Sequence, residues 1–265
     1  MKQTILKYIS LLAFLGSPFF SSQTFAAECA TGTAPLAGCT IDVSDITYTL
    51  TGNITPASED IGIQFNTGAD RNDVTLTGNI TTTGVRAYGL RLSNSDSNTT
   101  NLTGNITTTG DNAVGLHLDN SDSNTTTITG DIITSGNDGD SEPILLEGSD
   151  SNTFTLSGAV HSLGGDQAIA VDATSQNNTF TFKRGVSFIG GLENNGGSTN
   201  KLIFDMGKSA SYNLDFDDTS WTMEDLHKPI VEGSAKSMGV SDIDNQAHIL
   251  YRRMDPVNDV LSERQ

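Results

Sequence analysis

The only cysteines of this 265-residue chain, Cys29 and Cys39, lie ten residues apart near its N-terminus. Their spacing differs from that of paired zinc ligands, and no histidine lies near them in the sequence. In an oxidising compartment, two cysteines at this separation can close one short loop. We therefore expect a disulfide that fixes the N-terminal end of the fold, and two free thiols are the alternative.

A second candidate for chemistry is the sequence Gly139-Asp140-Ser141-Glu142, which partly matches the Gly-Asp-Ser-Gly sequence around the nucleophile of serine proteases. Such a serine needs a histidine base and a third residue that orients the base. The histidines are widely separated along the chain: His117, His161, His227 and His248. No segment beside the repeats described below is large enough for a protease domain, so we interpret the match as coincidence.

Charged side chains on predicted strands are the third candidate. Arg86, Arg91, His117 and Glu147 fall on outward strand positions. Enzymes that cleave polysaccharides on a β-helix place clustered carboxylates or arginine on such a face, and glycoside hydrolysis requires a pair of carboxyl groups. These four residues are mixed in type, and the sequence indicates no stacked acid pair. We therefore expect a solvated strand face, with no catalytic residues and no cofactor.

Acidic residues recur at one phase of a repeated Ser-Asp-Ser-Asn sequence, at Asp96, Asp122 and Asp150. If these turns stack, the carboxylates repel one another, and bound calcium could relieve the repulsion. The Gly-Gly-x-Gly-x-Asp repeat of calcium-binding β-rolls is absent from the sequence. The interpretation that we favour is a row of solvated turns without a metal ion.

Two further series recur with nearly constant spacing. Glycines stand 26, 26, 26 and 28 residues apart at Gly52, Gly78, Gly104, Gly130 and Gly158. Asparagines follow a similar period at Asn72, Asn98, Asn124, Asn152, Asn178 and Asn200. We expect the glycines at tight corners, and the asparagines in an internal ladder whose side-chain amides bind the copies above and below. Simple turn propensity is the alternative for the asparagines.

The elements that position these residues are short strands. Apolar residues alternate with polar ones in each copy, as in the sets Ile61/Ile63/Phe65, Tyr88/Leu90/Leu92 and Val114/Leu116/Leu118. A period of two is typical of a strand with one buried face. A unit of about 26 residues with three such strands cannot bury its apolar face alone, whereas stacked copies can. The sequence therefore predicts an all-β fold, a right-handed parallel β-helix of about six or seven coils.

The segments outside the repeats differ in composition. Residues 1–26 have a basic start, an apolar middle and small residues at the exit, which is typical of a secretory signal peptide. We expect an N-terminal cap at 27–40, the β-helix at 41–218 and a linker at 219–240. Apolar residues then recur at helical spacing from Ile243 to Leu261, so we expect a helical segment over 241–265.

Overall charge excludes some partners. The chain carries 32 acidic and 14 basic residues, for a net charge of −18. A strongly acidic surface repels phosphate groups, which excludes nucleic acid as a main partner and disfavours anionic membrane surfaces.

Three features support a family resemblance: the predicted signal peptide at 1–26, the repeats of the type Leu76-Thr77-Gly78-Asn79-Ile80 and the segment from Trp221 onward. Together they resemble the passenger region of bacterial autotransporters, the proteins of type V secretion. The resemblance implies a β-helical passenger, a helical linker and then an outer-membrane β-barrel. The chain reaches Gln265 about where that barrel would begin, so we expect the barrel to be absent from this chain.

From the repeats and the resemblance we expect a chain exported through the inner membrane to the periplasm, the cell surface or the medium. Its expected role is that of an adhesin-like interaction module without catalysis, with molecules of host or neighbouring cell surfaces as partners. A carbohydrate-active β-helix enzyme, a lyase or a hydrolase, is the alternative.

Overall fold

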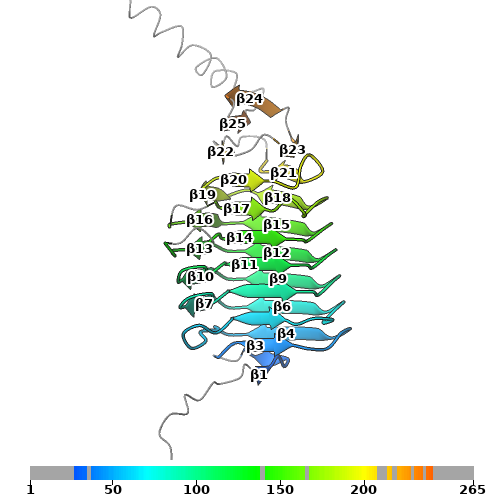
Figure 1. The fold of residues 1–265 in the computed structure, drawn as a ribbon, viewed down its shortest axis with the longest axis vertical. Helices are drawn as coiled ribbons and strands as arrows, with labels where there is room; N and C mark the ends of the chain where they lie inside the picture. Colours follow the sequence, from blue (N-terminus) through cyan, green and yellow to red (C-terminus); the bar gives the residue numbers. More distant parts are fainter. Residues whose placement is uncertain are drawn as a thin grey trace, which may run out of the picture.

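A computed structural model describes residues 27–34, 37–137, 141–164, 167–207, 214–216, 220–227, 230–234 and 237–240. The chain forms a β-solenoid of about six turns, in which parallel sheets run the length of the stack (Figure 1). No helix occurs among the residues of these ranges, and within them none could span a membrane. The predicted signal peptide at 1–26 and the predicted helical segment at 241–265 lie outside the described residues.

Each regular turn of the solenoid contributes one strand to each of three sheets, here named A, B and C. Sheet B has nine strands in the order β2 (Gly32–Thr33), β4 (Thr47–Thr51), β6 (Asp73–Thr77), β9 (Thr99–Thr103), β12 (Thr125–Thr129), β15 (Thr153–Ser157), β18 (Thr179–Lys183), β21 (Lys201–Asp205) and β23 (Thr222–Asp225). All neighbours are parallel, and equivalent residues of successive copies face each other, as Leu76 faces Leu102.

Sheet C follows the glycine corner of each turn and has the fewest strands of the three sheets. Its five strands are β7 (Ile80–Thr83), β10 (Ile106–Thr109), β13 (Ile132–Thr134), β16 (Ala159–Ser162) and β19 (Ser187–Ile189). A single parallel bridge from Ile54 to Ile80 continues this sheet toward the N-terminus. In Figure 1, sheet C lies along the left side of the stack.

Sheet A completes each turn. Its eight strands are β1 (Ala27–Glu28), β3 (Cys39–Ile41), β5 (Ile63–Phe65), β8 (Leu90–Ser93), β11 (Leu116–Asp119), β14 (Ile144–Glu147), β17 (Ile169–Val171) and β20 (Leu192–Asn194). Sheet D, at the C-terminal end, is antiparallel and has three strands: β22 (Leu214–Asp215), β25 (Ser237–Val240) and β24 (Ile230–Ser234).

The core is a set of apolar columns between the sheets, built from the alternate residues of each strand. Leu76 and Leu102 of sheet B and Leu90 and Leu116 of sheet A are all at most 2% exposed, as the alternation predicts. Toward the C-terminus the columns become aromatic: the rings of Phe154 and Phe180 stack at 4.6 Å, and Trp221 meets Phe180 edge-on. Larger side chains thus fill the stack where it ends.

The corner glycines are required by both conformation and space. Gly104 has a φ of +143°, and a Cβ on it would lie 2.0 Å from the carbonyl oxygen of Gly78 in the previous turn. Gly78 approaches Gly52 in the same way, and Gly130 approaches Gly104. A larger residue at any of these corners would separate two turns of the solenoid.

The sheets extend past the boundaries that the sequence predicts for the β-helix. Strands β1, β2 and β3 of the expected cap already belong to sheets A and B, and β23, within the expected linker, is the last strand of sheet B. Short strands here carry too few alternating residues for a period to be recognised in the sequence.

Candidate functional site

The periodic asparagines form a continuous buried ladder at the turn between sheets A and B. The Oδ1 atom of Asn98 accepts a hydrogen bond from the backbone N–H of Asn72 at 2.8 Å. The Oδ1 atom of Asn124 accepts one from the backbone N–H of Asn98 at the same distance. Asn152, Asn178 and Asn200 continue the series. The main acceptors of the ladder therefore bind backbone N–H groups, and direct amide–amide bonds such as that from Asn98 Nδ2 to Asn124 Oδ1, 3.2 Å, are additional.

Serines and aspartates of the same turn form two more ladders. The buried Ser121 Oγ accepts from the backbone N–H of Ser95, and Ser149 Oγ accepts from that of Ser121. On the outside, Asp96 Oδ1 accepts from the backbone N–H of Asp122 at 2.8 Å. Asp70, Asp122 and Asp150 each make the equivalent bond to the following turn.

The aspartate ladder gives the acidic turns a structural role that the sequence interpretation lacked. These carboxylates lie on the surface, as expected, but one oxygen of each caps a backbone N–H instead of facing only water. Among the described residues, no group of three or more His, Cys, Asp or Glu side chains is arranged to hold a metal ion.

A fourth ladder lies at the glycine corner and was not predicted. Asn53 Oδ1 accepts from the backbone N–H of Asn79, and Asn79 accepts from Asn105 in turn. Asp131 extends the series, accepting from Ala159 at 2.7 Å. The recurring Gly-Asn and Gly-Asp pairs were visible in the sequence, and comparing them with the buried asparagine series could have found this ladder.

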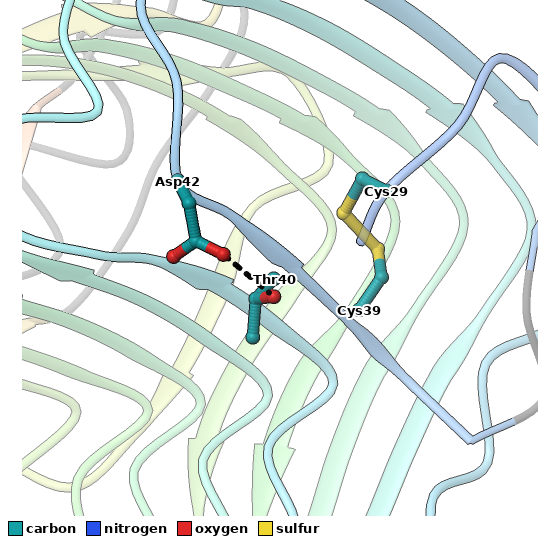
Figure 2. The surroundings of a disulfide bond; sticks show 4 residues. All are labelled: Cys29, Cys39, Thr40 and Asp42. Carbon is teal, nitrogen blue, oxygen red and sulfur yellow. Dashed lines mark hydrogen bonds between the residues drawn. A yellow bond between two sulfur atoms is a disulfide. The ribbon is translucent and has the colours of Figure 1, made fainter. Parts of the chain in front are cut away.

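Cys29 and Cys39 form a disulfide that joins the residue after strand β1 to the first residue of strand β3 (Figure 2). Cys39 is fully buried, and Cys29 is 7% exposed. Next to the disulfide, the Thr40 hydroxyl donates to the Asp42 carboxylate at 3.3 Å. The bond lies at the N-terminal end of the stack, where β1 pairs with β3.

Ser141, the serine of the partial protease sequence, is fully buried. Its Oγ accepts from the backbone N–H of Asn112 at 3.1 Å, a contact between turns like those of the serine ladder. Gly139 and Asp140 lie outside the described residues. Ser141 is thus a structural residue and is not accessible as a nucleophile.

Sheet A carries a group of chemically diverse side chains, which we call the Tyr88 cluster: Tyr88, Arg91, His117, Asp119 and Glu147. Arg91 Nη2 pairs with Asp119 Oδ2 at 2.9 Å, and His117 Nε2 contacts Glu147 Oε2 at 2.8 Å. The Tyr88 ring lies near one member of each pair, with its centroid 5.1 Å from that of His117 and 5.4 Å from Arg91 Cζ.

Of the predicted outward residues, Arg91, His117 and Glu147 lie on neighbouring strands of sheet A, whereas Arg86 lies in a turn and acts on the cluster only through its charge near Tyr88. Arg86 occupies a turn before β8 with a φ of +58° and is exposed. The alternation groups Tyr88 with the inward residues Leu90 and Leu92. In the structure Tyr88 lies before strand β8, and its ring contacts the ring of His117. Gly89 follows Tyr88, and a Cβ on Gly89 would lie 2.6 Å from the carbonyl oxygen of Gly115 in the next turn.

The cluster also contains a stacked acid pair that the sequence interpretation missed. Asp119 and Glu147 are register partners in β11 and β14. The pair was missed because it involves the last residue of each strand, beyond the apolar triplets. Each acid contacts a different basic side chain, Arg91 for Asp119 and His117 for Glu147.

Exposure decides what this cluster can contact. The His117 side chain is 5% exposed and its Nδ1 has no hydrogen-bond partner, whereas the Glu147 side chain is 52% exposed. Burial raises the pKa of the Tyr88 phenol, although the nearby Arg91 and Arg86 act in the opposite direction. Tyr88 therefore keeps its proton at neutral pH. A ligand would meet an aromatic ring, a guanidinium and two carboxylates, with the imidazole beneath them.

Comparisons with known proteins give no further information on this site. Neither the scan against protein-family models, nor the search of curated proteins, nor the search of solved structures finds a match to the chain.

Proposed function

We propose that this chain is an exported β-helical passenger of the autotransporter type, with right-handed coils, that acts as a non-catalytic interaction module. The leader-like composition of residues 1–26, the Leu-Thr-Gly-Asn-Ile repeats and the β-solenoid fold support the proposal. A disulfide between its only cysteines agrees with export to an oxidising compartment.

The partner that fits the Tyr88 cluster best is a carbohydrate of a host or neighbouring cell surface. Aromatic rings pack against the apolar faces of sugars, while the planar guanidinium of Arg91 and the carboxylates of Asp119 and Glu147 can bind hydroxyl groups. The observation that carries this proposal is the pairing of each acid with its own partner side chain, Asp119 with the Arg91 guanidinium and Glu147 with the His117 imidazole. Paired in this way, the carboxylates suit binding more than proton transfer.

The test is glycan-array screening followed by calorimetry on residues 27–265. We expect binding of a surface glycan that Tyr88→Ala and Arg91→Ala weaken roughly tenfold or more, equivalent to about 1.4 kcal/mol. Arg71→Ala is the matched control, because Arg71 is also a surface arginine paired with an aspartate, Asp45, but lies outside the cluster. Failure to bind any glycan, or equal losses in all three variants, would contradict the proposal.

A carbohydrate-active enzyme remains the second candidate, because Asp119 and Glu147 are stacked in register. Glycoside hydrolysis uses two carboxyl groups. If the chain releases reducing ends or unsaturated products from a polysaccharide, and Glu147→Gln abolishes this activity, the enzyme is correct and the non-catalytic module is not.

A further inference from the structure

A second surface of the solenoid has a different chemistry. The outward positions of five consecutive strands of sheet B, which we call the threonine face, are occupied almost entirely by threonine: Thr47, Thr49 and Thr51 of β4, Thr75 and Thr77 of β6, Thr99 and Thr103 of β9, Thr125, Thr127 and Thr129 of β12, and Thr153 and Thr155 of β15. The exceptions are Asp73, Asn101 and Ser157.

The threonine face is a regular grid. Equivalent residues pair in parallel without a shift from β4 to β15, so that Thr49, Thr75, Asn101, Thr127 and Thr155 form one straight column. Neighbouring strands lie about 4.8 Å apart, and outward side chains two residues apart along a strand lie about 6.7 Å apart. Threonine is branched at Cβ, which restricts its χ1 angle, so the hydroxyls and methyls have few alternative positions.

The grid is free to bind, and it is nearly neutral. No hydroxyl of its threonines makes a hydrogen bond within the described part of the protein. Asp73 is the only charged residue at the outward positions of these five strands, although the chain as a whole has 32 acidic residues. The acids instead occupy turns, as in the aspartate ladder. A neutral face on so acidic a protein does not suit a charged partner.

We propose that the threonine face binds the surface of crystalline water. A rigid grid of hydroxyls and methyls can order water in register with itself, and the spacing between strands, about 4.8 Å, is close to one oxygen–oxygen repeat of hexagonal ice. The grid is formed before binding, so few side chains lose conformational freedom on contact with a crystal. The ligand class is thus a periodic, uncharged lattice of hydrogen-bonding groups.

A crystalline polysaccharide would also be periodic and neutral, but the face lacks the side chains that it requires. Flat sugar chains bind to exposed aromatic rings, and the aromatic residues of these five strands, Tyr48 and Phe154, are both buried. The threonine face lies on sheet B and the Tyr88 cluster on sheet A, so the two binding functions can be tested independently.

The test measures inhibition of ice recrystallisation and the shaping of single ice crystals by residues 27–265. We expect inhibition by the unchanged chain and a roughly tenfold higher concentration for the same effect in Thr127→Lys, because a long charged side chain at the centre of the grid holds the lattice away. Thr107→Lys is the matched control: Thr107 is an outward, partly exposed threonine of strand β10 in sheet C, off the grid. Thr77→Lys, at the edge of the face, should act in the same direction as Thr127→Lys.

Circular dichroism and thermal unfolding establish that each variant is folded. Absence of ice shaping by the folded, unchanged chain overturns the proposal. Equal loss in Thr127→Lys and Thr107→Lys also overturns it, as does retention on crystalline cellulose or chitin without any effect on ice.

Discussion

At the scale of single residues, the solenoid depends on side chains that substitute for the backbone where the sheets are interrupted. At the turn between sheets A and B, the backbone N–H groups of the asparagines find no carbonyl partner and bind a side-chain oxygen of the next turn. Asn124 also donates from Nδ2 to the Ser95 carbonyl at 3.1 Å. Asn124 therefore binds both a donor, the Asn98 N–H, and an acceptor, the Ser95 carbonyl, of the preceding turn within a dry interior.

We predict that Asn124→Ala lowers the free energy of unfolding by about 3 kcal/mol. The substitution leaves the buried N–H of Asn98 and the carbonyl of Ser95 unpaired, and each such group costs about 1–3 kcal/mol. Chemical denaturation is the measurement. Asn101→Ala is the control, since Asn101 lies on the outer face of β9, and we expect a change below about 0.5 kcal/mol. Equal effects of the two substitutions would show that the ladder adds nothing beyond turn propensity.

At the scale of elements, the periodicity predicted strand positions and register well, because both depend on local alternation. It could not predict the Tyr88 cluster. Tyr88 lies outside its strand and contacts Arg91 of its own turn and His117 of the next turn. Alternation indicates which face a strand residue occupies, but contains no information about how a residue before the strand folds over that face.

We predict that the inward-facing positions of the strands do not tolerate a charged side chain. In Leu116→Asp, a carboxylate without a partner would enter the apolar column between Leu90 and Ile144, at a position that is fully buried. We expect a loss of at least about 4 kcal/mol in stability, which denaturation would measure.

Thr127→Asp provides the comparison, because it places the same charge on the outer face of strand β12. We expect this variant to unfold within about 0.5 kcal/mol of the unchanged chain. Unaltered thermal unfolding of Leu116→Asp would mean that sheet A does not have the assigned register.

At the scale of the whole molecule, the regular contacts of the solenoid join successive turns. Strands of each parallel sheet pair only with their equivalents one turn away, and every ladder runs along the same axis. Stability in such a fold is approximately a sum of the contribution of each turn and of the interfaces between turns. The length of the stack can therefore change without loss of the fold, provided that the register is kept.

Deletion of residues 99–124 should accordingly remove one turn and leave a shorter solenoid. The segment spans one period of 26 residues between Asn98 and Asn124, so the deletion lets Asn152 serve the N–H of Asn98, as Asn124 does now. Leu90 would then face Ile144 directly, and β6 would pair with β12. We expect cooperative unfolding with a Tm lowered by less than about 10 °C.

Deletion of 99–111 alone removes β9 and β10 but keeps β11, so sheet A has one strand that lacks its equivalents in sheets B and C. That variant should fail to unfold cooperatively. If both deletions lose the cooperative transition in calorimetry, the turns are not the independent stacking units that the ladders indicate.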